Sequence, residues 1–570
     1  MNNMKFMRLI VGCLVVVAMV KFFFSPSHEA HHKNHQVIQG ESFWAQHHVR
    51  QQNVADHQED PVNPEPQTDS QNVQKKEEVV APEVIEAADN TATGPQRIVH
   101  LDLKGAPPKV KYLEQIFPLF STLGANGILL EYEDMFPYEG DLQILRSSNA
   151  YSPEEIEEIK SLAKRHHLEL IPLVQVFGHL EFVLKHEKFF HLREVASFPN
   201  SLNSLAPESM DLVKDMLSQV MQKHPESRWF HIGADEVRGL GESEDSKRWL
   251  ETHNGDMGKL FLNHVTAVGR FMTAQHPGIR LILWDDMFRK LSPGSIKESE
   301  LQSLASPMIW DYHAKMDVHE IGNLIHKYEQ AGFQTVWFAS AFKGASGIDQ
   351  ILTPIDHHFN NHLQWHKVIQ SMPEHKSISF QGIVLTGWQR YEHHTVLCEL
   401  LPVAIPSLAV CLQTLKYGDF NDAAQSDVQR MLGCEVQLKQ NNCKGSTYPG
   451  ADIYEMVKKI NSSLGSSIQK IMKSYHIRGS FSPYHRKRNF ANPRNLGFFH
   501  NSLKLLLDEW DTFLLGFRRS MEEIYYSDTL EEWLEENVNE HIETLHEMVV
   551  DVERIIKLNG QPKADHAKMR

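Results

Sequence analysis

The chain lacks several features that mark common classes of protein. Only five of its 570 residues are cysteine, and no two of them stand in a Cys-x-x-Cys spacing, which argues against a structural zinc site. It has no extended run of Lys and Arg, and its net charge is −16, which argues against nucleic acid as a partner. No Gly-rich phosphate-binding loop is evident, so we expect neither a phosphate ligand nor a bound cofactor.

The N-terminal region differs in composition from the rest of the chain. Lys5 and Arg8 precede an apolar run over residues 9–20, and residues 6–24 come close to the ~20 that span a bilayer. Basic residues before such a run favour a cytoplasmic N-terminus. We therefore expect residues 1–24 to be a signal-anchor, with a cleaved signal as the alternative. This predicts a type II membrane protein of the secretory pathway with a lumenal catalytic domain, in which Cys434 and Cys443 are close enough in sequence to pair.

Residues 25–96 are rich in Pro, Glu, Gln and His and poor in aromatic residues. Such a composition buries too little apolar surface to offset the entropy of ordering, so we expect a disordered stem. From residue 97 onward, short apolar segments alternate with amphipathic ones. The strand-like segments are 97–103, 126–132, 168–176, 228–233, 280–284, 307–310, 333–338 and 381–386, and helix-like segments between them include 152–167, 207–224, 257–275, 319–331 and 356–371. This alternation predicts a (β/α)8 barrel over 97–415, with an open doubly wound sheet as the alternative. Amphipathic stretches after residue 416 predict a helical C-terminal region over 416–570.

Polar and aromatic residues gather where the predicted strands end. The segment His231-Ile-Gly-Ala-Asp235-Glu236 ends the fourth strand in two adjacent carboxylates. Barrels of this type place their active sites at the carboxyl ends of the strands. Neighbouring charges push pKa values apart, so two adjacent acids can divide the work, one protonated and one ionised. We therefore expect the catalytic pair to be Asp235 and Glu236.

Tryptophan recurs at four consecutive strand ends, as Trp284, Trp310, Trp337 and Trp388. Each one alone is more often a core residue. Four at the mouth of one barrel would form an aromatic wall on which the apolar face of a pyranose can stack, while nearby carboxylates take its hydroxyls. The pattern therefore predicts a neutral sugar as the substrate.

These motifs carry a resemblance to a known family. His-Ile-Gly-Ala-Asp-Glu after a strand resembles the catalytic signature of the family 20 glycoside hydrolases, the β-N-acetylhexosaminidases. Leu-Glu-Tyr-Glu-Asp-Met-Phe136, Phe-Gly-His179-Leu-Glu, Trp284-Asp-Asp and Thr-Gly-Trp388 extend the match over residues 97–415. Within the family the likeness is to the hexosaminidase D subgroup, and that subgroup implies the nucleus and cytoplasm as the alternative location.

The resemblance implies an exo-acting enzyme that removes terminal β-linked N-acetylglucosamine or N-acetylgalactosamine from a glycan or glycoconjugate. In this retaining reaction the 2-acetamido group of the substrate is the nucleophile. Glu236 would be the general acid and base, and Asp235 would orient the acetamido group. The residues expected to bind the sugar are His179, Glu131, Trp284, Asp285, Trp310, Tyr312, Trp337 and Trp388, with no metal.

Two departures from larger family members stand out. Those members place an Arg after the first strand, where this chain has Lys104, and their Trp-x-Glu at the eighth strand is here Trp388-Gln389-Arg390. Two other functions stay open from the sequence. One is a metal-dependent hydrolase using His100 and Asp102, and the other is a sugar-binding barrel without catalysis.

Overall fold

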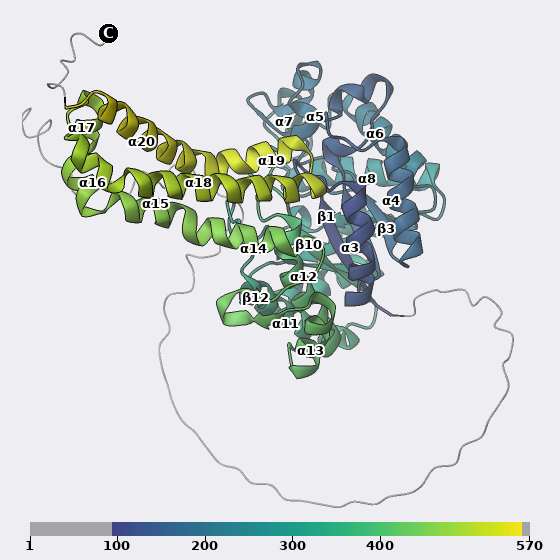
Figure 1. Cartoon of the computed structure of the whole chain (residues 1–570). Helices are drawn as coiled ribbons and strands as arrows, with labels where there is room; N and C mark the ends of the chain where they lie inside the picture. The colour runs from purple at the N-terminus through teal and green to yellow at the C-terminus, as the bar shows by residue number, and fades with distance from the viewer. Residues whose placement is uncertain (1–93, 561–570) are drawn as a thin grey trace, which may run out of the picture. The chain divides into compact units, whose positions relative to one another are not determined.

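The computed structural model describes residues 94–560, and its centre is a closed barrel of eight parallel strands (Figure 1). Residue pairs such as Val99 with Leu385 and Asp102 with Glu131 join the first strand to the last and to the second. The strands follow the ring order β1 (Gln96–Asp102), β10 (Ser379–Gly387), β9 (Thr335–Lys343), β8 (Ala305–Trp310), β7 (Arg280–Trp284), β6 (Trp229–His231), β3 (Glu169–Leu173) and β2 (Gly127–Glu131). The predicted (β/α)8 barrel is therefore confirmed. The open-sheet alternative is wrong, because β1 pairs with β10 and closes the ring.

Amphipathic helices alternate with these strands, as the sequence predicts. They are α3 (Val110–Leu123), α4 (Pro153–Arg165), α6 (Ser209–Lys223), α8 (Met257–Gln275), α10 (Val318–Ala331), α11 (Ile355–Ser371) and α12 (Leu401–Tyr417), with shorter α7 (Glu244–Thr252) and α9 (Pro293–Glu298). The start of α4 shows the local cause. The Ser152 hydroxyl accepts from the backbone N of Glu155, whose carboxylate accepts from the backbone N of Ser152, and Pro153 takes the first helical position.

The long loop after β3 contains structure that the periodicity does not predict. It holds the single-turn helix α5 (Glu181–Leu184) and a hairpin of β4 (Arg193–Val195) with β5 (Phe198–Leu202). The Asn200 side chain of this hairpin donates to Glu181 and accepts from the backbone N of Arg238. The loop therefore braces the segment that follows β6.

The region after the barrel is helical, as predicted. It contains α13 (Asp422–Leu432), α14 (Ala451–Lys459), α15 (Gly465–Met472), α16 (Tyr475–Ser480), α17 (Pro483–Arg488), α18 (Pro493–Ile524), α19 (Ser527–Leu534) and α20 (Glu540–Lys557). Figure 1 shows α18 and α20 running side by side. Leu503, Leu507, Trp510, Leu514 and Phe517 recur every three or four residues and form the buried face of α18. The same hydrophobic core cluster contains barrel residues, so the helices and the barrel share one core.

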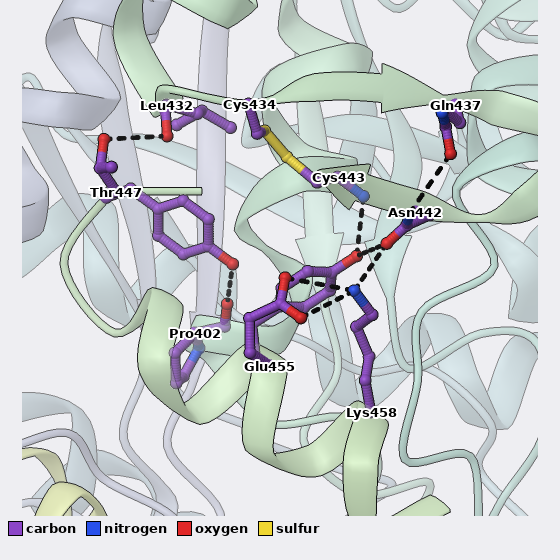
Figure 2. The surroundings of a disulfide bond; sticks show 11 residues. Pro402, Leu432, Cys434, Gln437, Asn442, Cys443, Thr447, Glu455 and Lys458 are labelled. Carbon is purple, nitrogen blue, oxygen red and sulfur yellow. Dashed lines mark hydrogen bonds and ion pairs between the residues drawn. A yellow bond between two sulfur atoms is a disulfide. The ribbon is translucent and has the colours of Figure 1, made fainter. Parts of the chain in front are cut away.

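A disulfide joins Cys434 to Cys443 across the hairpin of β11 (Glu435–Gln437) and β12 (Asn442–Lys444) (Figure 2). The Tyr454 hydroxyl of α14 accepts from the backbone N of Cys443 at 2.9 Å, and Lys458 donates to Asn442. The hairpin is thus tied to α14 as well as closed on itself. The remaining cysteines of the described residues, Cys398 and Cys411, are buried thiols.

The prediction of a type II membrane protein is corrected by the structure. Within residues 94–560, no helix combines the length and the apolar character needed to cross a bilayer. The segment 6–24 on which the prediction depended lies outside the described residues, as does nearly all of the stem expected over 25–96. The membrane topology therefore finds no support and is withdrawn.

Candidate active site

The candidate catalytic pair lies on an unusual turn after β6. Gly233, Ala234 and Glu236 have φ angles of +61°, +71° and +42°, in the left-handed region that is costly for residues other than glycine. A Cβ on Gly233 would stand 2.0 Å from Oε1 of Gln175, so only glycine fits there. The His231 ring accepts from the backbone N of Gly233 at 3.0 Å. Both acids therefore belong to a turn with a strained backbone.

The loop after β3 approaches the turn closely and brings His179 to the pair. A Cβ on Gly178 would stand 2.0 Å from the backbone O of Asp235, so the two backbones are in direct contact. Nε2 of His179 lies 3.6 Å from Oδ2 of Asp235 and 3.3 Å from Oε2 of Glu236. Nε2 of Gln175 donates to Oδ1 of Asp235 at 3.0 Å. One imidazole therefore serves both acids, and an amide fixes one of them.

The charges around the pair polarise the two acids in opposite directions. Burial alone would raise the pKa of Glu236, but the His179 and Arg238 side chains outweigh burial and lower it to about 2. Nη2 of Arg238 lies 2.8 Å from Oε2 of Glu236. Burial, then the charge of Glu236, raises the pKa of Asp235, although His179 opposes the shift. Burial would lower the pKa of His179, but Asp235 and Glu236 outweigh it and hold that pKa well above its usual value. These shifts favour the carboxylate form of Glu236 and the protonated form of His179.

The two acids after β7 have different environments, although the sequence predicts a role in sugar binding only for Asp285. Asp285 is fully buried and accepts a two-pronged contact from Arg289 and a hydrogen bond from the Tyr328 hydroxyl. Tyr328 lies on the outer helix α10, so the carboxylate of Asp285 is directed toward that helix. Asp286 instead accepts from the backbone N of Glu236 at 2.9 Å. The contacts of Asp285 are therefore those of a structural residue, and Asp286 is the acid that contacts the catalytic turn.

Asp286 also links the catalytic turn to the aromatic wall. Its Oδ1 accepts from Nε1 of Trp310 at 3.4 Å. Burial, then the nearby charge of Asp235, raises the pKa of Asp286 to about 7. The side chain therefore changes its charge near neutral pH inside the candidate site.

Three of the four predicted tryptophans meet at the mouth of the barrel. The ring of Trp284 lies 5.7 Å from that of Trp388, and the ring of Trp310 stacks on Tyr312 at 5.4 Å. Burial raises the pKa of Tyr312, so its hydroxyl keeps its proton and can donate. These rings form an aromatic wall at the carboxyl ends of the strands, and Asp286 connects it to the acid pair.

Trp337 does not join this wall. It is the third residue of the nine-residue strand β9, and its ring packs edge-on against Trp229, the first residue of β6, at 5.0 Å. Both residues therefore lie toward the amino ends of the strands, in the opposite end of the barrel. The sequence predicts that this strand ends at residue 338, whereas the strand continues to Lys343. Because the predicted strand is too short, it places Trp337 near the carboxyl end instead of the amino end.

A buried network of charges forms the side of the site at the ends of β1 and β2. Nε2 of His100 donates to Glu131 at 3.0 Å, because its Nδ1 accepts from the backbone N of Gly387. Nζ of Lys104 lies 3.0 Å from Asp102 and 3.6 Å from Glu131. Burial would raise the pKa of Glu131, but Lys104 and then His100 lower it to about 2. Glu131 therefore holds Lys104 in place beside the aromatic wall.

The proposed metal pair of His100 and Asp102 does not converge, because each binds its own partner in this network. Within residues 94–560, one group of metal-ligand side chains does converge, formed by Glu133, Asp134 and His393. Nζ of Lys185 lies 3.2 Å from Asp134 and 2.8 Å from Nε2 of His393. A lysine ammonium already contacts two of the three ligand atoms, so these residues do not fit a metal centre.

Arg238, Gln175 and Asp286 are the site residues that the predicted sugar-binding set lacks. Gln175 and Asp286 were visible as polar residues at strand ends, but their targets, Asp235 and the backbone of Glu236, depend on how the loops fold. Arg238 follows the acids by two residues, and nothing in the local pattern distinguishes it from a solvated arginine.

Comparison with known proteins identifies the family of this chain. Residues 118–393 match the glycosyl hydrolase family 20 catalytic domain, and the chain belongs to this family of glycoside hydrolases. Hexosaminidase D of Homo sapiens is 46% identical over 462 residues, which cover 80% of this chain and 94% of that protein. Hexosaminidase D of Bos taurus is 56% identical over 337 residues, which cover 59% of this chain and 96% of that protein. The β-N-acetylhexosaminidase of Bacteroides fragilis shares 16% identity, with a TM-score of 0.44, over 62% of this chain and 75% of that chain. The predicted family is therefore confirmed.

Proposed function

We propose that this enzyme is an exo-β-N-acetylhexosaminidase that removes terminal β-linked N-acetylglucosamine or N-acetylgalactosamine from glycans. The observation that carries the proposal is the turn after β6, which presents Asp235 and Glu236 together beside His179 and an aromatic wall. Two relatives that this chain covers almost completely carry the name hexosaminidase D, which agrees with this activity.

The reaction proceeds in two steps with retention at the anomeric carbon. Glu236 gives its proton to the glycosidic oxygen while the carbonyl oxygen of the 2-acetamido group attacks the anomeric carbon, so the aglycone leaves as an alcohol. An oxazolinium intermediate forms. Glu236, now a carboxylate, takes a proton from water as the water attacks the same carbon, and the acetamido group is restored.

Asp235 acts on the acetamido group without bonding to the sugar. Its Oδ1 accepts from Gln175, which leaves Oδ2 to receive the acetamide N–H and to stabilise the positive charge that develops there. The Tyr312 hydroxyl donates to the acetamide oxygen, and Trp284 and Trp310 enclose its methyl group. Trp388 provides the face on which the pyranose stacks.

The proton that Glu236 delivers comes from His179. The two acids raise the pKa of the imidazole, which favours its protonated form, and Nε2 of His179 lies 3.3 Å from the carboxylate that must receive the proton. Moving it to Glu236 converts a cation and an anion into two neutral groups, which a water-excluded site favours. Binding of a neutral sugar dries the site and promotes this transfer, so the acid is protonated when substrate is present.

Lys104 donates to sugar hydroxyls, and Glu131 acts through it. Nζ of Lys104 lies over the Trp388 ring, 5.4 Å from its centre, and therefore close to where a sugar at this ring would bind. Glu131 is almost fully buried and is held by His100 and Lys104, so its contribution is to fix the lysine.

The test uses aryl β-N-acetylglucosaminide and β-N-acetylgalactosaminide, with and without a thiazoline inhibitor that mimics the intermediate. We expect turnover that the thiazoline blocks and that a metal chelator leaves unchanged. Glu236→Gln should lose on the order of 10²–10⁴-fold in rate on substrates with poor leaving groups and less on activated aryl glycosides. Glu244→Gln, an exposed acid on α7, is the matched control and should keep full activity. Binding without turnover by the wild-type enzyme would instead support the sugar-binding alternative, and loss on chelation would support the metal-dependent one.

A further inference from the structure

Helix α19, in the C-terminal helical region, contacts the mouth of the barrel through an ion pair. The Arg390 guanidinium, in the loop after β10, donates to both carboxylate oxygens of Glu532 on α19. It also donates to the backbone O of Thr395 in its own loop. The Arg390 side chain is 11% exposed and that of Glu532 is 30% exposed. A two-pronged pair that is shielded from water in this way fixes both side chains more firmly than a surface pair does.

A second contact comes from the same face of α19, three residues earlier. The Thr529 hydroxyl donates to the backbone O of Gly105, in the loop after β1, at 3.0 Å. Gly105 has a φ of +72°, and a Cβ on it would stand 2.1 Å from Nη2 of Arg390. The guanidinium therefore lies directly on the Gly105 backbone. Through Thr529 and Glu532, α19 joins the loop after β1 to the loop after β10.

Each of these two loops carries a residue that we propose to contact the sugar. Lys104 lies in the first loop, and Trp388 stands two residues before Arg390 in the second. The backbone N atoms of Lys104 and Gln389 both donate to the Asp102 carboxylate, at 3.2 and 2.8 Å, so the loops are joined at their base as well. The contacts with α19 complete this junction from the outer side.

We propose that Glu532 and Thr529 are positioning residues for the hydrolysis, which hold Lys104 and Trp388 in the geometry that binds the sugar. Neither residue touches the sugar itself. The family match ends at residue 393, so α19 lies outside the catalytic domain that the match defines. The helical C-terminal region is thus part of the architecture of the active site. This inference rests on the proposed function, because it concerns the binding of that substrate.

Loosening the wall weakens contacts that the sugar makes both before and during the reaction, so it acts mainly on KM. Glu532→Gln keeps the side-chain size but leaves the shielded Arg390 without a counter-charge. We expect the KM for aryl β-N-acetylglucosaminide to rise about tenfold while kcat stays within about threefold. Glu531→Gln makes the same change of charge at the exposed neighbouring position of α19 and should leave both constants at their wild-type values.

Thr529 supplies an independent test with a conservative rescue. Thr529→Val removes the hydroxyl donor and should raise KM, whereas Thr529→Ser keeps the donor and should restore it. If Glu532→Gln folds poorly, the double variant Arg390→Gln with Glu532→Gln removes both charges together and should still show the raised KM.

Thermal unfolding and active-site titration with the thiazoline inhibitor separate positioning from folding. A purely structural role would lower Tm and the fraction of active enzyme while KM stays unchanged. A wild-type KM in both Glu532→Gln and Thr529→Val overturns the proposal. Absence of turnover by the wild-type enzyme is a different result and would refute the proposed function instead.

Discussion

Replacement of Arg238 by Gln is a direct test of how the acid pair is polarised. The guanidinium lies 2.8 Å from Oε2 of Glu236, within a cluster that also holds His179, Asp235 and Asp286. Removing a positive charge raises the pKa of the nearby carboxyl groups, because their carboxylates lose a favourable neighbour, and it raises the pKa of His179, because the imidazolium loses an unfavourable one. The cluster therefore keeps its catalytic proton to a higher pH in Arg238→Gln. The alkaline limb of the profile of kcat/KM against pH should move upward.

The size of the shift follows from the geometry and the exposure of the pair. Two unit charges about 4 Å apart interact by ~4 kcal/mol at an effective dielectric constant of ~20. The Arg238 side chain is 34% exposed, and solvent reduces such an interaction toward the ~1 kcal/mol of surface pairs. Since 1.36 kcal/mol corresponds to one pKa unit, we expect the alkaline limb to move up by roughly one pH unit. High salt should reduce the shift, because the pair is partly in contact with solvent.

The assay measures kcat/KM for an activated aryl β-N-acetylglucosaminide across the pH range, since this ratio reports the free enzyme. The control is Arg270→Gln, which breaks an exposed pair between Arg270 and Glu300 on the outer helices and should leave the profile unchanged. A limb that stays in place, or that moves to lower pH, would show that Arg238 does not set the protonation of the pair. The polarisation described above would then have to be abandoned.

Three further predictions concern other parts of the site. Asp235→Asn should lower kcat by on the order of 10²–10³-fold with a much smaller change in KM, and successive fluorination of the substrate acyl group should slow the wild type more steeply than the variant. A trapped covalent bond from a 2-fluoro sugar to Asp235 would contradict the acetamido nucleophile. The fold raises the pKa of Asp286 to about 7, so this residue stabilises the protein below pH 4 and loses that contribution as the pH rises to 7. The Tm of Asp286→Asn should therefore increase relative to that of the wild type between pH 4 and pH 7. A difference in Tm that stays constant over this range would contradict the prediction. Trp284→Phe should raise KM, whereas Trp337→Phe should leave KM unchanged and cost on the order of 1–3 kcal/mol in unfolding free energy, measured by denaturant titration.

The barrel was predictable because its signals are local and repeated. Each strand is a short apolar run, each helix has a 3.6-residue period, and caps such as Ser152 with Glu155 mark where helices begin. A closed ring of eight strands is the arrangement in which eight such units bury all their apolar faces. The loop after β3 was not predictable in the same way, since its hairpin is held by single contacts such as that between Asn200 and Glu181.

Two site residues were misplaced for one geometric reason. Side chains alternate between the two faces of a strand, so a shift of one residue in the prediction places a side chain on the wrong face. An error of a few residues in the end of a strand places a side chain at the wrong end of the barrel. Asp285 and Asp286 are adjacent, and only the contacts of Arg289 and Tyr328 show that the first faces outward. Apolar residues flank Trp337 in the sequence, so the local pattern does not show where the strand ends. Only the hydrogen-bonded ladder to Lys343 shows how far the strand continues beyond Trp337.

The adjacency of Asp235 and Glu236 does not by itself decide which acid holds a proton. His179 and Arg238 both contact Glu236, while Gln175 supplies only a neutral amide to Asp235, so the free enzyme ionises the residue that must act as the acid. The arrangement makes sense if the proton is stored on the imidazole and is transferred only when a sugar excludes water. Protonated Glu236 is then present only in the complex with the sugar, and the contact with Arg238 determines how readily Glu236 takes up the proton.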